Sequence, residues 1–200
     1  GDVEVLAAFD INDLANRVYE HNHGLRPNPA DIRSLTPSFL SDFRADTWLL
    51  SPPCQPYTRQ GLQRGSEDPR AESFILLLDK LALMAHKPTY VLVENVVGFE
   101  QSETRRLLVE TLRSNQYATQ EVIASPVDVG VPYSRARYFC LAKLQPVTQF
   151  ANPEWNSHIL DKLPPEMGGG SKITEVACDA NGNSNANGNA NRDGDANDNG

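Results

Sequence analysis

The chain has 200 residues, enough for one domain with a sizeable core, and its composition is that of a globular protein. No apolar run reaches the ~20 residues of a membrane span, and the N-terminus lacks a signal-peptide pattern, so we expect no membrane partner and an intracellular location, in cytoplasm or nucleus. The net charge of −8 argues against nucleic-acid binding driven by overall charge, and three widely separated cysteines argue against a disulfide framework or a metal site.

The first half of the chain alternates predicted strands and helices. Residues 3–10 (VEVLAAFD) read as a buried strand ending in an acid, and residues 11–22 place Leu14 and Val18 at helical spacing. After a proline-rich connection, Thr36 and Pro37 predict the start of a short helix, and residues 46–50 (DTWLL) predict the next strand.

The second half continues the alternation. We expect helices over residues 72–87 and 102–115, and strands over residues 89–96, 117–125 and 135–144, with a loop over 126–134. Strands that alternate with helices predict an α/β fold with a mostly parallel sheet covered on both faces. The last two strands predict an antiparallel edge of this sheet.

The end of the chain differs in composition from the rest. Residues after about Gly168 are rich in Asn and Gly and nearly devoid of apolar side chains, so they cannot bury enough surface to offset the entropy of ordering. We therefore predict one folded domain over residues 1–150, a linker or remnant of a further region over 151–167, and a disordered tail over 168–200.

The stretch SPPCQPYTRQG follows a predicted strand and places a cysteine between prolines. Pro52, Pro53 and Pro56 fix their φ angles and remove backbone donors, so Cys54 is predicted to lie on a stiff loop. Loops at the carboxyl ends of strands in α/β sheets commonly carry ligands and chemistry. The alternative is that Cys54 is a small buried apolar side chain.

Charged and polar residues also lie at the end of one predicted strand and at the start of another. Glu94 and Asn95 end the apolar strand VLVEN, so Glu94 is expected near Cys54 at one rim of the sheet, although it could equally cap the next helix or pair with an arginine. Arg135 and Arg137 alternate at a strand entrance and are predicted to share a face, where they bind an anion or remain solvated.

Taken in order, PPCQ, ENV and R-x-R before a closing strand resemble the cytosine-C5 methyltransferases, over residues 3 to about 144. Within that family, the tRNA branch, described as homologues of DNA methyltransferases, is most similar to three stretches of this sequence: SPPCQPYTRQG, ENVVGFE and PYSRARYFCLAKL. The resemblance implies a Rossmann-like, S-adenosylmethionine-dependent methyltransferase fold, with residues 1–150 as its partial catalytic domain.

The resemblance also implies a mechanism. Cys54 would add to C6 of cytosine as a thiolate, Glu94 would bond the ring at N3 and the exocyclic amine, and Asn95 would hold the loop. Arg137, with Arg135 beside it, would contact the base carbonyl or a phosphate. The substrate implied is a cytosine in a tRNA anticodon loop.

For the methyl donor S-adenosylmethionine, the resemblance implies contacts along the same rim. Asp10 would bind the ribose hydroxyls and Ile11 would cover an adenine face. Asp31 and Ile32 resemble the next adenine contacts, and Pro53 would line the methionine end.

The chain departs from the family at its start, because no strand with a Gly-rich F-x-G-x-G loop is present. We therefore expect an incomplete fold that lacks the family's first strand, and we expect this loss to weaken donor binding and activity of the chain. The alternatives to a tRNA enzyme are a DNA cytosine-C5 methyltransferase and a non-catalytic methyltransferase-like fragment.

Overall fold

The computed structural model describes residues 3–53 and 69–164, all of which belong to a unit that ends at Gly168. The predicted tail lies outside these residues. In chain order the elements are α1 (Asp13–His23), η1 (Ile32–Ser34), α2 (Pro37–Asp42), β1 (Thr47–Leu50), α3 (Pro69–Leu83), β2 (Tyr90–Val96), η4 (Phe99–Gln101), α4 (Glu103–Ser114), β3 (Tyr117–Ala124), η5 (Pro126–Val129), β4 (Arg137–Leu144), η6 (Pro153–Ser157) and β5 (Ile159–Leu160).

Three helices begin where a side chain accepts hydrogen bonds from their first turn. The Asn12 side chain accepts from the backbone amides of Leu14 and Ala15 at the start of α1. Thr36 caps α2 in the predicted way, and Ser102 caps α4. These side chains satisfy amide groups that a helix leaves without an internal partner, so local sequence fixes where each helix starts.

The α/β class is confirmed, and the sheet has the order β1-β2-β4-β3-β5. β1 pairs parallel with β2 and β5 pairs parallel with β3, whereas β4 is antiparallel to both β2 and β3. The predicted antiparallel pairing of β3 with β4 is confirmed, but two predictions are wrong for the described residues: β4 lies inside the sheet rather than at its edge, and the sheet is mixed rather than mostly parallel. A short connection makes β3 and β4 neighbours, but it does not decide on which side of β3 the strand returns. That side is set by β2, whose free edge pairs with β4 along seven residues.

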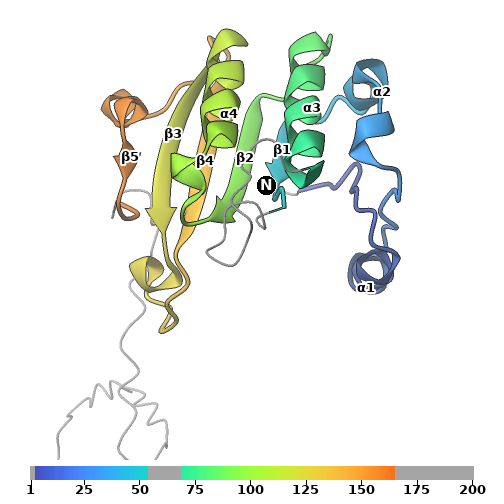
Figure 1. Cartoon of the computed structure of the whole chain (residues 1–200), viewed down its shortest axis with the longest axis horizontal. Coiled ribbons are helices and arrows are strands. Elements are labelled where there is room, and N and C mark those ends of the chain that lie inside the picture. Colours follow the sequence, from blue (N-terminus) through green and yellow to red (C-terminus); the bar gives the residue numbers. More distant parts are fainter. Residues whose placement is uncertain (1–2, 54–68, 165–200) are drawn as a thin grey trace, which may run out of the picture. The chain divides into compact units, whose positions relative to one another are not determined.

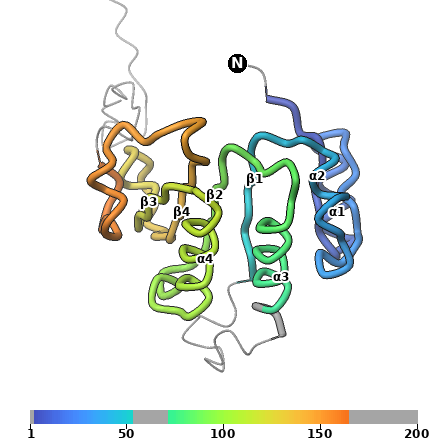
Figure 2. Tube along the Cα trace, turned by 90° about the horizontal axis from the view of Figure 1, so that it is seen from above, coloured from blue at the N-terminus to red at the C-terminus, as the bar shows by residue number. Residues whose placement is uncertain are grey.

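Two helices cover one face of the sheet. Figures 1 and 2 show α3 and α4 side by side on the same face, with α1 and α2 beyond β1 rather than over the sheet. The core lies between α3, α4 and the strands, and fully buried Leu108 and Leu112 each contribute about 1.5–3 kcal/mol by removal from water.

The opposite face of the sheet carries no helix within residues 3–53 and 69–164, so the prediction of two covered faces is wrong for this part of the chain. The burial pattern alternates accordingly along β2 and β4, with buried residues on the helix side. Leu49 of β1 is 73% exposed. α1 and α2 stand beside the edge of β1 and cover neither face.

The predicted strand over residues 3–10 does not form, and this prediction is also wrong. Val3 is 91% exposed and Val5 52% exposed, and within residues 3–53 and 69–164 the segment makes one bridge, between Phe9 and Asn28. An extended segment becomes a strand only when a neighbour offers a row of backbone partners, and among the described residues Asn28 alone does so. The helix α1 forms as predicted, but its apolar face, including Leu14, remains exposed.

A buried carboxylate ties α4 to the sheet. The Glu121 side chain on β3 is 5% exposed, and the Arg105 guanidinium on α4 meets its two oxygens at 2.6 Å each. The Tyr138 hydroxyl on β4 donates to the same carboxylate at 2.6 Å, and burial raises the pKa of this tyrosine. Charge-assisted contacts of this kind fix three elements relative to one another.

The segment 151–167, predicted to be a linker or remnant, contains η6 and the short strand β5, which extends the sheet beside β3. No helix of the described ranges is long and apolar enough to cross a membrane.

Candidate active site

Glu94 and Arg137 meet at the rim where β2 ends and β4 begins. In the antiparallel register, Arg137 lies opposite Val96 and Glu94 lies opposite Phe139, so the two charged residues are diagonal neighbours on one face. Arg137 Nε lies 3.1 Å from Glu94 Oε1, and the two side chains are 18% and 36% exposed. Glu94 thus pairs with an arginine, which was one alternative to a catalytic role, and this arginine is itself a predicted catalytic residue. Its proximity to Cys54 stays a prediction.

Asn95 links this rim to the proline-rich loop. Its side chain is 2% exposed; its Nδ2 donates to the Pro52 carbonyl at 3.3 Å, and its Oδ1 accepts from the Val96 amide at 2.8 Å. The carboxyl ends of β1 and β2 are thereby held together two residues before Cys54. Cys54 itself lies outside the described residues, so its contacts and its role stay predictions. Pro53 is the last described residue of this loop and is exposed.

Arg135 takes a different position from Arg137. It precedes β4, is exposed, and is fixed by its backbone amide, which donates to Ser125 Oγ at 3.1 Å. Within the described part of the chain its guanidinium forms no ion pair, whereas that of Arg137 holds Glu94. The structure brings together Glu94 and Arg137, and it leaves Arg135 at the outer side of the same rim.

The predicted donor residues fall on two segments that lie side by side. The Asn28 amide donates to the Ala8 carbonyl at 2.8 Å, and the Asp10 amide donates to the Asn28 carbonyl at 3.3 Å. This pairing sets Asp10 and Ile11 beside the segment that leads to Asp31. One oxygen of Asp10, Oδ1, accepts from the Asn12 amide at 2.7 Å, and Ile11 is 72% exposed.

These features suit a ligand that carries hydroxyl groups and a flat ring. Among the described residues the second oxygen of Asp10 has no hydrogen-bond donor, so it can accept from hydroxyl groups, and the exposed Ile11 side chain offers an apolar surface to a flat ring. Ile32 contributes less, because it is partly buried and packs against the core.

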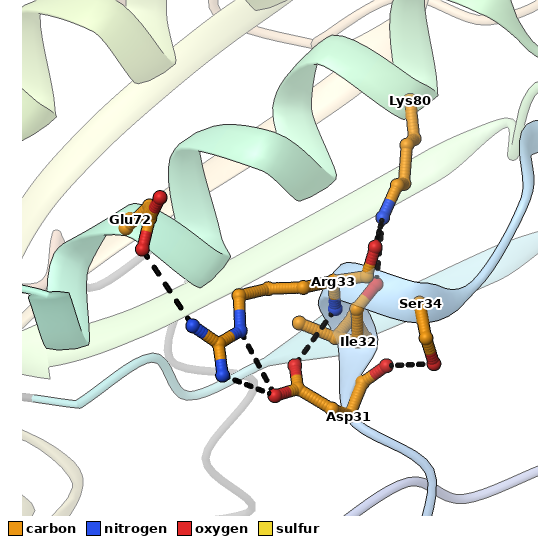
Figure 3. Close-up of polar contacts among 6 residues, drawn as sticks. All are labelled: Asp31, Ile32, Arg33, Ser34, Glu72 and Lys80. Atoms are coloured by element: carbon orange, nitrogen blue, oxygen red, sulfur yellow. Dashed lines mark hydrogen bonds and ion pairs between the residues drawn. The ribbon is translucent and has the colours of Figure 1, made fainter.

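Asp31 is held in a network that the sequence did not predict (Figure 3). It caps η1 by accepting from the Arg33 amide at 2.9 Å, and its other oxygen accepts from Arg33 Nε at 2.9 Å and Nη2 at 2.6 Å. The Arg33 side chain lowers the pKa of the Asp31 carboxyl, so this group stays an ionised acceptor.

Helix α3 supports this turn from the other side. Lys80 Nζ donates to the carbonyls of Ile32 at 2.8 Å and Arg33 at 2.7 Å, and Glu72 lies 3.7 Å from the Arg33 guanidinium. The D-x-R spacing of Asp31 and Arg33 was a readable signal. The contacts with Glu72 and Lys80 join residues about 40 or more positions apart, and no local pattern predicts them.

Comparisons with known proteins agree with these motifs. A family model described as C-5 cytosine-specific DNA methylase matches residues 1–194. The tRNA (cytosine(38)-C(5))-methyltransferase of Bos taurus is 44% identical over 144 residues, which cover 72% of this chain and 37% of the relative. The DNA (cytosine-5)-methyltransferase of Dictyostelium discoideum is 43% identical over 145 residues, covering 71% of this chain and 38% of the relative.

A solved structure of a Spodoptera frugiperda DNMT2 mutant matches with 38% identity and a TM-score of 0.70, over 84% of this chain and 50% of that one. The chain thus spans half or less of the length of these proteins. The family model, the sequence identity to these relatives and the similarity of the fold all point to one family, whose motifs include the paired Glu94 and Arg137. The chain belongs to the C-5 cytosine-specific DNA methylase family.

Proposed function

We propose that this chain carries the catalytic part of an enzyme that methylates C5 of a cytosine in tRNA through a covalent cysteine adduct. The observation that carries the proposal is the Glu94–Arg137 pair, with 3.1 Å between the two side chains, at the rim to which Asn95 ties the loop of Cys54. A carboxylate and a guanidinium at one edge can together bond the polar atoms of a pyrimidine ring.

The chemistry assigns one task to each residue. The Cys54 thiolate forms a bond to C6 of the cytosine, which makes C5 nucleophilic. Glu94 bonds the ring at N3 and the exocyclic amine as electrons move into the ring, and Arg137 holds the Glu94 carboxylate and faces the base carbonyl. S-adenosylmethionine supplies the methyl group that C5 takes. Loss of the C5 proton then restores the ring and breaks the bond between sulfur and C6.

The donor is assigned to the segments of Asp10, Ile11, Asp31 and Ile32, with Pro53 toward its methionine end. In the part of the chain that the structure describes, Asp10 has one acceptor oxygen without a donor, Ile11 is exposed, and Arg33 keeps Asp31 ionised. These residues bind and orient the adenosine part.

Transfer RNA is favoured as the substrate because several relatives are named tRNA (cytosine(38)-C(5))-methyltransferases, among them those of cattle and mouse. An unpaired loop base also reaches a catalytic rim without the opening of a long duplex. DNA is the second candidate, because the similar Dictyostelium discoideum protein is named a DNA (cytosine-5)-methyltransferase.

Trapping of the covalent adduct tests the proposal. The chain is incubated with S-adenosylmethionine and 5-fluorocytosine-substituted tRNA, in which fluorine at C5 blocks the final loss of a proton. A band of adduct should survive a denaturing gel, and Cys54→Ser should lack it. Equal adduct in the serine variant would remove Cys54 as the nucleophile. Parallel assays with labelled donor decide the substrate, and preferential labelling of duplex DNA would reverse the ranking.

A further inference from the structure

The loop between β3 and β4 has a fixed shape. Its first turn, η5, begins after Ser125, whose amide donates to Asp128 Oδ2 at 2.8 Å, and it ends at Gly130, which has a φ of 82°. The Val131 amide donates back to the Pro126 carbonyl at 3.1 Å. Further along, the Arg135 amide donates to Ser125 Oγ at 3.1 Å, so the loop is closed at its base.

This fixed loop exposes apolar side chains. Val127, Val129 and Val131 are 50%, 47% and 45% exposed, and Tyr133 is 57% exposed. Water contact with such side chains is unfavourable, and a loop that holds them outward by its own hydrogen bonds cannot bury them by collapsing. A cluster of this kind at a functional rim indicates a contact surface.

The loop lies at the same rim as the Glu94–Arg137 pair, since β3 ends at Ala124, which lies opposite Arg137. Tyr133 precedes Arg135 by two positions, and Arg135 is exposed and forms no ion pair within the described residues. The one carboxylate of η5, that of Asp128, is turned back to the loop, where it accepts from the Ser125 amide. Toward solvent the loop therefore offers an aromatic ring and a guanidinium.

We propose that the β3–β4 loop binds an unpaired nucleotide adjacent to the target cytosine, with Tyr133 stacking on its base beside Arg135, for which the family resemblance already implies a phosphate contact. Base and aromatic ring stack without regard to base identity, and a free guanidinium complements the phosphate. A duplex would not satisfy this surface, because its base faces are already stacked. The inference rests on the proposed function for the identity of the neighbouring target, and its new element is Tyr133, which is not among the predicted site residues.

Fluorescence anisotropy tests this surface with the full chain and a labelled, unstructured RNA about 10 nucleotides long. Tyr133→Ala should weaken binding at least about five-fold, the loss expected for one stacked base. Tyr133→Phe should bind as the wild type does, because the ring remains. The matched control is Tyr90→Ala, which removes a tyrosine that is 40% exposed at the other end of β2, and it should leave affinity unchanged.

Absence of RNA binding by the wild type, or equal affinity of wild type and Tyr133→Ala, would overturn the inference, as would an equal loss in Tyr90→Ala. Sedimentation velocity tests whether the loop instead binds a second copy of this chain. A wild-type dimer that Tyr133→Ala converts to a monomer, with RNA affinity unchanged, would make the loop a self-association surface. If the wild type forms the covalent adduct but Tyr133→Ala leaves RNA affinity unchanged, the inference about this surface is refuted and the proposed function is not. If Tyr133→Ala weakens RNA binding but the wild type forms no covalent adduct, the proposed function is refuted and the inference about this surface is not.

Discussion

Replacement of Arg105 by methionine should destabilise the fold strongly. The change removes both guanidinium contacts from Glu121, whose side chain is 5% exposed, and among the described residues it leaves the Tyr138 hydroxyl as the remaining side-chain donor. Removal of one partner of a buried pair costs about 3–5 kcal/mol, because the other charge stays buried without compensation. With a denaturant slope of about 2 kcal/mol per molar urea, the midpoint should fall by roughly 2 M.

The assay is urea unfolding followed by circular dichroism, with Arg106→Met as the matched control. Arg106 is the next residue on α4, makes contacts of the same 2.6 Å length to Glu103 and Glu110, and is 57% exposed. Its loss should barely move the midpoint, because water screens exposed pairs. In the double variant with Glu121→Gln, stability should partly return. Equal midpoints for the two arginine variants would refute the argument from burial.

Three further outcomes are expected. Burial raises the pKa values of Tyr117 and Tyr138, so the stability that their neutral hydroxyls contribute is present below about pH 10 and is lost as the pH rises further. The loss reaches at most about 1.4 kcal/mol per pH unit for each tyrosine. Urea midpoints measured at alkaline pH should show this decline, and Tyr138→Phe should make it shallower. Burial also raises the pKa of the Cys140 thiol to about 12, so iodoacetamide should modify Cys140 only after unfolding, as peptide mass mapping would detect. Asn95→Ala removes the bond to the Pro52 carbonyl and should slow adduct formation, since a displacement of about 1 Å can cost 10²-fold; an unchanged rate would contradict a positioning role for Asn95.

Local chemistry predicted the helices well. Thr36 and Pro37 mark the start of α2 by a side-chain acceptor and a fixed φ, both of which act within one turn. The same holds for the apolar runs that became β1 and β2, because a strand buried on its helix side needs apolar residues wherever it is placed.

Features that depend on distant partners escaped prediction. Residues 3–10 have the apolar content of a strand, but pairing needs a neighbour, and only Asn28 supplies one among the described residues. The interior position of β4 depends on the free edge of β2, which no local pattern contains.

The candidate site divides in the same way. The motifs around Glu94 and Arg137 were readable, whereas their diagonal contact follows from the register of two strands separated by a helix and a third strand. Glu121 on an apolar strand was a signal that sequence reasoning passed over. Its partner Arg105 lies 16 residues earlier on a helix.

The interior position of β4 imposes an order on folding during synthesis. Ribosomes release β2 and β3 first, yet β1 covers only one edge of β2, and β3 pairs with β4 and β5 alone. Until residue 144 has emerged, the two strands that should flank β4 expose unpaired backbone edges to any extended chain nearby. A nascent chain that stalls before this point therefore holds the β1–β2 pair and a β3 whose partners β4 and β5 have not yet been released, and Glu94 and Arg137 come together only when β4 is inserted.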